Sequence, residues 1–92
     1  MIESFKHKGL KKLYDKGDRS GIRSDIADKA ELYLSILDTA QSLEKLDCKG
    51  FSLHRLTGNM KDWFSVWVSR NHRIIFLFEN ETAFDVDLVD YH

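Results

Sequence analysis

The apolar residues of this chain change their spacing at Gly50, and that change divides the sequence into a helical part and a strand part. Before Gly50 they recur every three or four positions, the period of a helix that buries one face. After Gly50 they alternate with polar residues or crowd with β-branched and aromatic ones, as in strands. A chain of 92 residues has room for one small core. The pattern therefore predicts a single domain over residues 1–92.

Two to three helices are expected in the first part, after a short strand at residues 2–5. The first helix covers about residues 6–16 and ends at Gly17, because glycine readily takes the left-handed conformation that ends helices. The second begins at Ser24 or Asp25, either of which can cap it with a side-chain oxygen. Its apolar stripe consists of Ile26, Ala30, Leu34 and Leu37. Leu43 and Leu46 indicate a further helical turn.

Four strands are expected in the second part, at about residues 51–56, 63–68, 72–78 and 83–89. Their short connections imply antiparallel neighbours. In the last strand, strict alternation would turn Phe84, Val86 and Leu88 toward the helices. The predicted fold class is α+β, with the N-terminal strand and the helices packed on one face of a twisted antiparallel sheet.

Composition and charge indicate the cellular compartment of the chain and the kind of partner it can bind. It has no apolar run near the roughly 20 residues that span a membrane, and its start does not match a secretion signal. A lone Cys48 cannot form an internal disulfide, so a reducing compartment, the cytoplasm, is expected. The net charge of −1 divides into +3 for residues 1–29 and −4 for the rest. The basic part suits either an anionic polymer or a solvated helix face.

Residues able to carry chemistry gather at the end of the sequence. The last predicted strand leads directly into Asp90, Tyr91 and His92, which are a carboxylate, a phenol and a group that titrates near neutral pH. A strand docked in the sheet would hold these three side chains in place. This triplet is therefore the first candidate site.

Other candidates come from the strand region. His54 and Arg73 lie on predicted strands, and Arg55 and Lys61 lie near the turn at residues 57–59. One histidine can take a proton while a second gives one in the same step, and an arginine fork matches phosphate oxygens. Together with a carboxylate and a tyrosine, they form the set of groups that a metal-free ribonuclease uses.

The residues alone also allow structural roles for the same side chains. His54 fits a surface histidine, and Arg73 fits a cross-strand ion pair. Trp63 and Trp67 fit either the core or a platform that stacks on bases. His7 and His72 are interpreted as incidental. No spacing typical of a metal site is present, so neither a metal nor another cofactor is expected.

The whole chain resembles the HigB-type toxins of the RelE/ParE superfamily, the toxin halves of bacterial toxin–antitoxin pairs. The resemblance rests on residues 1–10, 37–40, 53–58 and 71–76 and on the closing Val89-Asp90-Tyr91-His92. It implies a RelE-like toxin that enters the A site of the 70S ribosome and cuts mRNA there. It also implies an antitoxin of the helix-turn-helix, HigA type.

By this resemblance, His54, Asp90, Tyr91 and His92 would take part in cleavage, and Arg73 would contact the scissile phosphate. The sequence departs from the pattern in three places. Thr57 stands where such toxins usually carry a loop lysine, for which Arg55 or Lys61 could substitute. His72 stands where tryptophan is common, and the net charge is low for a protein that meets ribosomal RNA.

Two other functions use the same scaffold. A ParE-type toxin inhibits DNA gyrase without cleaving RNA, and the Asp90-Tyr91-His92 ending argues against it. A non-catalytic RNA-binding module would retain the fold with a decayed site.

Overall fold

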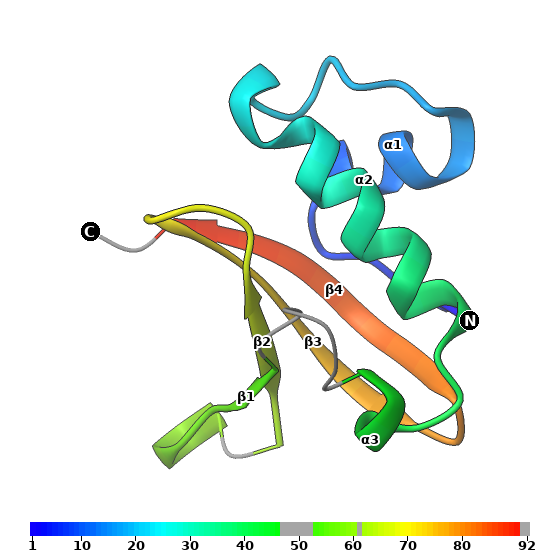
Figure 1. The fold of residues 1–92 in the computed structure, drawn as a ribbon, viewed down its shortest axis with the longest axis vertical. Helices are drawn as coiled ribbons and strands as arrows, with labels where there is room; N and C mark the ends of the chain where they lie inside the picture. The colour runs from blue at the N-terminus through cyan, green and yellow to red at the C-terminus, as the bar shows by residue number, and fades with distance from the viewer. Residues whose placement is uncertain (47–52, 61, 91–92) are drawn as a thin grey trace.

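Two long helices pack against a four-stranded antiparallel sheet in the computed structural model, which describes residues 1–46, 53–60 and 62–90 (Figure 1). The strands lie in the order β1-β2-β3-β4. The predicted α+β fold is confirmed, while Cys48, Lys61, Tyr91 and His92 lie outside the described residues. The elements are α1 (Lys8–Lys16), α2 (Ser24–Thr39), α3 (Leu43–Leu46), β1 (His54–Arg55), a 3-10 turn (Gly58–Met60), β2 (Phe64–Trp67), β3 (His72–Glu79) and β4 (Thr82–Asp90).

The N-terminal segment runs along the outer edge of β4. Ile2 and Phe5 form parallel bridges with Ala83 and Val86. The Glu3 N–H donates to the Ala83 carbonyl at 2.9 Å, and the Val86 N–H donates to the Ser4 carbonyl at 3.1 Å. The strand expected at residues 2–5 is therefore a short edge pairing, and it joins the two ends of the described chain.

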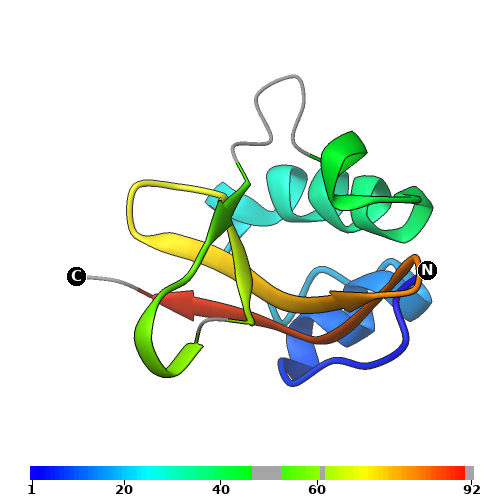
Figure 2. The same ribbon diagram turned by 90° about the horizontal axis from the view of Figure 1, so that it is seen from below.

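The core lies between the helices and one face of the sheet. Fully buried side chains of the sheet, such as Phe76 and Val66, share one cluster with Leu10 of α1 and Leu37 of α2. α2 and α3 lie on the same side of the long β3–β4 hairpin (Figure 2). The sheet is strongly twisted, so β1 and β2 cross the line of β3 and β4 steeply (Figure 1). Among the described residues, no helix has the length and apolar composition of a membrane-spanning helix.

The helix ends show which capping predictions are correct. Gly17 ends α1 in the left-handed conformation (φ 66°), as predicted, and its N–H donates to the Leu13 carbonyl. At the other end of α1, the ring nitrogen Nδ1 of His7 accepts from the Leu10 N–H at 3.1 Å, so His7 is an N-cap. The predicted cap of α2 is wrong. Its N-cap residue is Arg23, which makes no side-chain cap and instead pairs with Asp25.

A β-bulge in β4 overturns one expected orientation. The pairing register shifts between Ile75 and Leu77, and Asp85 has a positive φ of 50°. The Ser4 hydroxyl accepts from the Asp85 N–H at 2.8 Å, which secures the bulge from the N-terminal segment. As a result Phe84 pairs with Leu77 and leaves the helix side. Val86 and Leu88 remain on the helix side, as expected.

A close backbone approach makes Gly9 sensitive to substitution. A Cβ at Gly9 would lie 2.3 Å from the carbonyl oxygen of Gly21, which is backbone and cannot rotate away. We expect Gly9→Ala to lower the free energy of unfolding by about 3 kcal/mol, measured by urea denaturation. Gly58→Ala is the control, because it has open space but a φ of +67°, and it should cost about 1 kcal/mol. Equal losses in the two variants would contradict the close approach.

A hydrogen bond between α1 and α2 should make stability depend on pH. The Tyr14 hydroxyl donates to Asp38 Oδ1 at 2.7 Å. This bond, together with burial, raises the pKa of Tyr14 from 10.0 to about 12. The folded pKa lies above the unfolded one, so the stabilisation is complete below pH 10 and is lost as the pH rises toward 12.

We therefore expect Tyr14→Phe to cost about 1 kcal/mol of unfolding free energy at neutral pH. The variant should lose less stability than the parent between pH 10 and pH 12, because it lacks the phenol. Chemical denaturation across this range measures both effects. Parallel stability curves for the two proteins would show that the Tyr14 bond does not contribute.

Candidate functional site

One side of the sheet does not meet the helices, and we call it the open face. Two cross-strand rows define it, because residues directly opposite each other in a sheet point to the same side. The rows are His54-Ser65-Ile75-Asp87 and Trp67-Arg73-Val89. None of these seven residues belongs to the core cluster. The open face therefore combines a histidine, a serine, an arginine, a tryptophan and a carboxylate.

Arg73 is held at the middle of the open face by an aromatic ring. Its guanidinium carbon lies 3.9 Å from the centroid of the Trp67 ring on the neighbouring strand. Such stacking fixes the plane of the guanidinium and leaves its edge donors able to reach a phosphate. Arg73 is half-buried, so less side-chain freedom is lost when it binds an anion.

A second pair of the same kind lies beside the start of β2. The Lys6 ammonium nitrogen is 5.4 Å from the centroid of the Trp63 ring. Lys6 comes from the N-terminal segment beside β4, so the pair links that segment to the start of β2. Trp63 and Trp67 are both half-buried and outside the core cluster. The core interpretation of the two tryptophans is therefore wrong.

His54 lies on the edge strand β1 and is exposed. Its cross-strand partner Ser65 is fully buried, and its hydroxyl makes no hydrogen bond within the part of the chain that the structure describes. A buried hydroxyl without a partner is costly and rare in folded proteins. On the open face, the imidazole of His54, which can transfer protons, therefore lies opposite the Ser65 hydroxyl, which makes no hydrogen bond among the described residues.

Arg55 lies on the other side of the sheet. It pairs with Phe64, a core residue, and its guanidinium carbon is 4.8 Å from the centroid of that ring. Alternation along β1 therefore separates Arg55 from His54 and Arg73, although all three were expected near one phosphate. The open face does not include Arg55.

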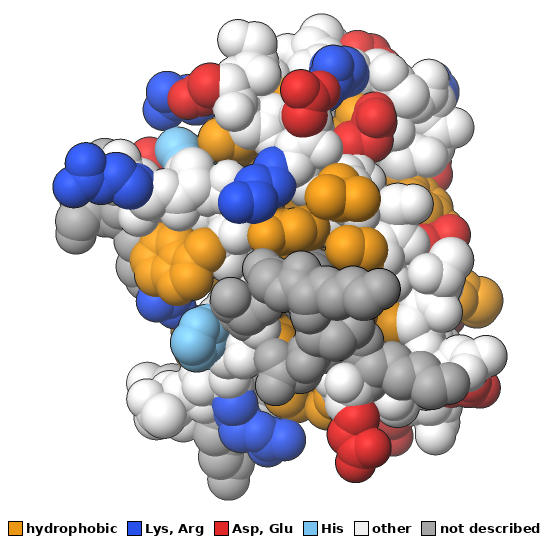
Figure 3. Space-filling model, in the orientation of Figure 1, with side chains coloured by type: hydrophobic (Ala, Val, Ile, Leu, Met, Phe, Trp, Pro, Cys, Tyr) orange, Lys and Arg blue, Asp and Glu red, His pale blue; other side chains and the backbone are white. Residues whose placement is uncertain are grey.

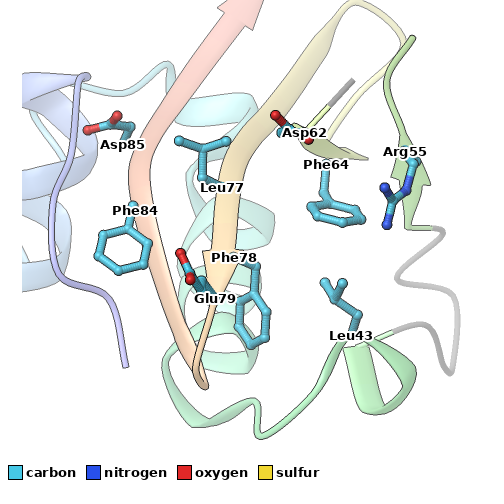
Figure 4. Close-up of a pocket in the computed structure, with 9 residues that line it drawn as sticks. All are labelled: Leu43, Arg55, Asp62, Phe64, Leu77, Phe78, Glu79, Phe84 and Asp85. Carbon is cyan, nitrogen blue, oxygen red and sulfur yellow. The ribbon is translucent and has the colours of Figure 1, made fainter. Parts of the chain in front are cut away.

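Arg55 instead borders a hollow of about 620 Å³ beside the start of β2 (Figure 4). Leu43 of α3 and the ring of Phe64 lie close to it in this view. Three carboxylates, those of Asp62, Glu79 and Asp85, also line the hollow. With one cation against three anions, this hollow disfavours a phosphate backbone.

Asp90 ends β4 on the helix side of the sheet, next to His72. The two residues pair across the strands, and His72 Nε2 lies 3.8 Å from Asp90 Oδ2. His72 is buried and its Nδ1 is 2.9 Å from the Ser69 hydroxyl. The interpretation of His72 as incidental missed this cluster. Its position directly before Arg73, at the start of a strand, was the available signal.

The described residues do not bring Asp90 and His54 together, because they lie on opposite edge strands and opposite faces. Tyr91, His92 and Lys61 fall outside the described residues. Within the described ranges, no three His, Cys, Asp or Glu side chains group in a way that could hold a metal ion.

Charge is distributed unevenly over the surface. In the view of Figure 3, Lys and Arg side chains lie mainly in the left half, over β1, β2 and the turn before β3. Asp and Glu lie mainly over the top and the right, where α2 runs. The histidine side chains visible in this view also lie in the left half. Basic and histidine side chains therefore gather over the same part of this view.

Two solved structures have a similar fold. YafQ from E. coli strain BL21(DE3) superposes with a TM-score of 0.62 and 13% identity, over 98% of this chain and 91% of that chain. A heterotetrameric YoeB–YefM toxin–antitoxin complex from Staphylococcus aureus contains a chain with a TM-score of 0.60 and 17% identity, over 100% of this chain and 95% of that one. At these identities the similarity concerns the fold alone.

Sequence comparison identifies the family. The chain is 40% identical to Endoribonuclease HigB of Proteus vulgaris over 92 residues, which cover 100% of this chain and 100% of that protein. Residues 3–92 match the HigB-like toxins, described as RelE-like toxins of the type II toxin–antitoxin system HigB. The chain therefore belongs to the HigB-like family of RelE-like toxins of type II toxin–antitoxin systems.

Proposed function

We propose that this toxin is a ribosome-dependent endoribonuclease that cuts mRNA in the A site and so stops translation. The observation that carries the proposal is the Arg73–Trp67 stack on the open face. It combines a fixed guanidinium for a phosphate with an aromatic surface for a base. The full-length similarity to a protein named Endoribonuclease HigB supports the same activity.

The proposed reaction needs no metal. One histidine takes the proton of a ribose 2′-OH, whose oxygen attacks the adjacent phosphorus. The bond from phosphorus to the 5′ oxygen breaks, and an acid protonates that leaving oxygen. The products are a 2′,3′-cyclic phosphate and a 5′-hydroxyl. Arg73 would stabilise the negative charge on the non-bridging oxygens.

We assign the proton transfers to His54 and His92, with Asp90 as the carboxylate that acts with them. Tyr91 would position or stack the nucleotide. His54 is exposed on its edge strand and so is accessible to RNA. Because Arg55 lies on the other face and Lys61 outside the described residues, Arg73 is the phosphate-binding residue in this proposal.

As the toxin of a toxin–antitoxin system, the chain has an antitoxin as its partner. We propose an antitoxin of the helix-turn-helix, HigA type, and the 70S ribosome with its mRNA as the target in the bacterial cytoplasm. The exposed lysines of α1 would assist ribosome binding. Two of them, Lys11 and Lys12, are paired with Asp15 and Asp18 at 2.6 and 3.8 Å. Exposed pairs of this kind are weak and exchange readily for phosphate contacts.

The direct test is primer extension on a defined mRNA in a purified translation system. The expected result is a set of cuts inside the A-site codon, with 2′,3′-cyclic phosphate ends, only when ribosomes are present. The same mRNA without ribosomes is the control and should remain intact. Inhibition of gyrase supercoiling without any RNA cut would instead favour the ParE-type alternative.

A further inference from the structure

Ser69, His72 and Asp90 form a polar cluster at one end of the sheet, where the turn between β2 and β3 meets the end of β4. The Ser69 hydroxyl oxygen is 2.9 Å from His72 Nδ1, and His72 Nε2 is 3.8 Å from Asp90 Oδ2. The imidazole is 10% exposed and the carboxylate is 48% exposed. The ring therefore stands between a structural turn and a carboxylate that faces solvent.

The hydrogen bonds around Ser69 determine which ring nitrogen of His72 carries the proton. The Ser69 hydroxyl oxygen accepts from the Asn71 N–H at 3.2 Å and from the His72 N–H at 3.1 Å. A hydroxyl has two acceptor lone pairs and one hydrogen. With both lone pairs in use, its hydrogen is left to donate to His72 Nδ1. Nδ1 is then the acceptor, and in the neutral ring the proton is on Nε2.

This tautomer directs an N–H donor toward Asp90. The 3.8 Å between Nε2 and Oδ2 exceeds hydrogen-bond length, but a shift of about 1 Å would close it. The Ser69 O–H occupies the lone pair of Nδ1, so the proton of the neutral ring stays on Nε2. The cluster therefore presents Asp90 with an N–H dipole of fixed direction.

We propose that His72 is a positioning residue, locked by Ser69 as the neutral Nε2–H tautomer, that orients the Asp90 carboxylate for RNA cleavage. This inference rests on the proposed function, in which Asp90 acts with the two histidines. Ser69 itself is not a nucleophile in this arrangement, because two backbone N–H groups hold its oxygen. His72 also directly precedes Arg73, so one strand start would place both the phosphate-binding residue and the residue that holds Asp90.

The tautomer can be measured without any activity assay. In nitrogen-15 NMR spectra of the free protein at neutral pH, His72 Nδ1 should give the signal of an unprotonated nitrogen and Nε2 that of a protonated one. In Ser69→Ala the lock is removed, and the neutral ring should give the nitrogen-15 signals of a mixture of the two tautomers. A proton on Nδ1 in the parent, or identical nitrogen-15 signals in both proteins, would overturn the lock.

The effect on Asp90 needs matched variants of His72. His72→Phe removes the donor, whereas His72→Gln keeps an N–H donor at the position of Nε2. In carbon-13 spectra at neutral pH, the chemical shift of the Asp90 carboxylate should change in His72→Phe, because the neighbouring N–H donor is lost. It should return toward the parent value in His72→Gln. Equal Asp90 shifts in all three proteins would overturn the proposal.

Cleavage kinetics then separate positioning from a structural role. At a temperature where circular dichroism shows all proteins folded, His72→Phe should lower kcat by about tenfold or more, with an unchanged apparent KM for ribosomes, and His72→Gln should stay within about threefold. Equal kcat losses in both variants would contradict positioning. If the parent makes no cuts, the proposed function fails, and the NMR spectra still decide whether His72 holds Asp90.

Discussion

Arg73→Ala should lower ribosome-dependent mRNA cleavage about 10²- to 10³-fold, the usual cost of removing one donor to a developing oxyanion. The guanidinium is fixed 3.9 Å from the Trp67 ring centroid, so its loss removes a preorganised charge that water cannot replace. Primer extension with rate constants from time courses measures the effect. The stack contributes only about 1 kcal/mol to folding, so the variant should remain folded.

Arg55→Ala is the matched control for Arg73→Ala. Both arginines stack on an aromatic ring of β2, but Arg55 lies on the helix side of the sheet. The control should therefore cleave within about threefold of the parent, because it removes no donor from the oxyanion. Arg73→Lys retains the charge without the planar fork and should fall between the two. A larger loss in Arg55→Ala than in Arg73→Ala would move the phosphate site to the other face.

His92→Ala and His54→Ala should each lower the cleavage rate about 10²- to 10⁴-fold, the range for loss of a general acid or base. The proposed reaction needs one group to take the 2′-OH proton and another to protonate the 5′ oxygen. Single-turnover cleavage on stalled ribosomes measures the chemical step. Asp90→Ala should follow the same pattern, because the carboxylate acts with the histidines.

The double variant His54→Ala/His92→Ala shows whether the two histidines act as a unit. Groups that cooperate in one step are strongly non-additive, so the double variant should lose little more than the worse single variant. A loss equal to the product of the single losses would mean that the histidines act independently. Parent-like cleavage by His92→Ala would remove the C-terminal triplet from the mechanism.

Much of the fold could be predicted from the sequence, because periodicity reports which face of an element is buried. The stripe through Ile26, Ala30, Leu34 and Leu37 predicted α2, and all four residues are buried in it. Local sequence patterns gave wrong orientations where contacts between residues distant in the sequence determine the backbone. Phe84 turns away from the helices because of a bulge at Asp85, and Ser4 secures that bulge from 81 positions away in the sequence.

The prediction of the candidate site was limited in the same way, because its residues come from strands that are distant in the sequence. Residue types identified His54 and Arg73, and both lie on the open face. They also suggested Arg55, which strand alternation places on the other face, a fact that depends on the pairing of β1 with β2. The Ser69–His72–Asp90 cluster was missed because it forms only when the β2–β3 turn meets the end of β4.

The central claim is that mRNA lies on the open face of the sheet. A stalled ribosome carrying 4-thiouridine in the A-site codon, bound to the His92→Ala variant and irradiated, would link the RNA to the nearest side chain. Mass spectrometry of the linked peptide identifies that residue. We expect links to Trp67, the half-buried ring of this face. Links to α2 or to the hollow beside Arg55 would contradict it.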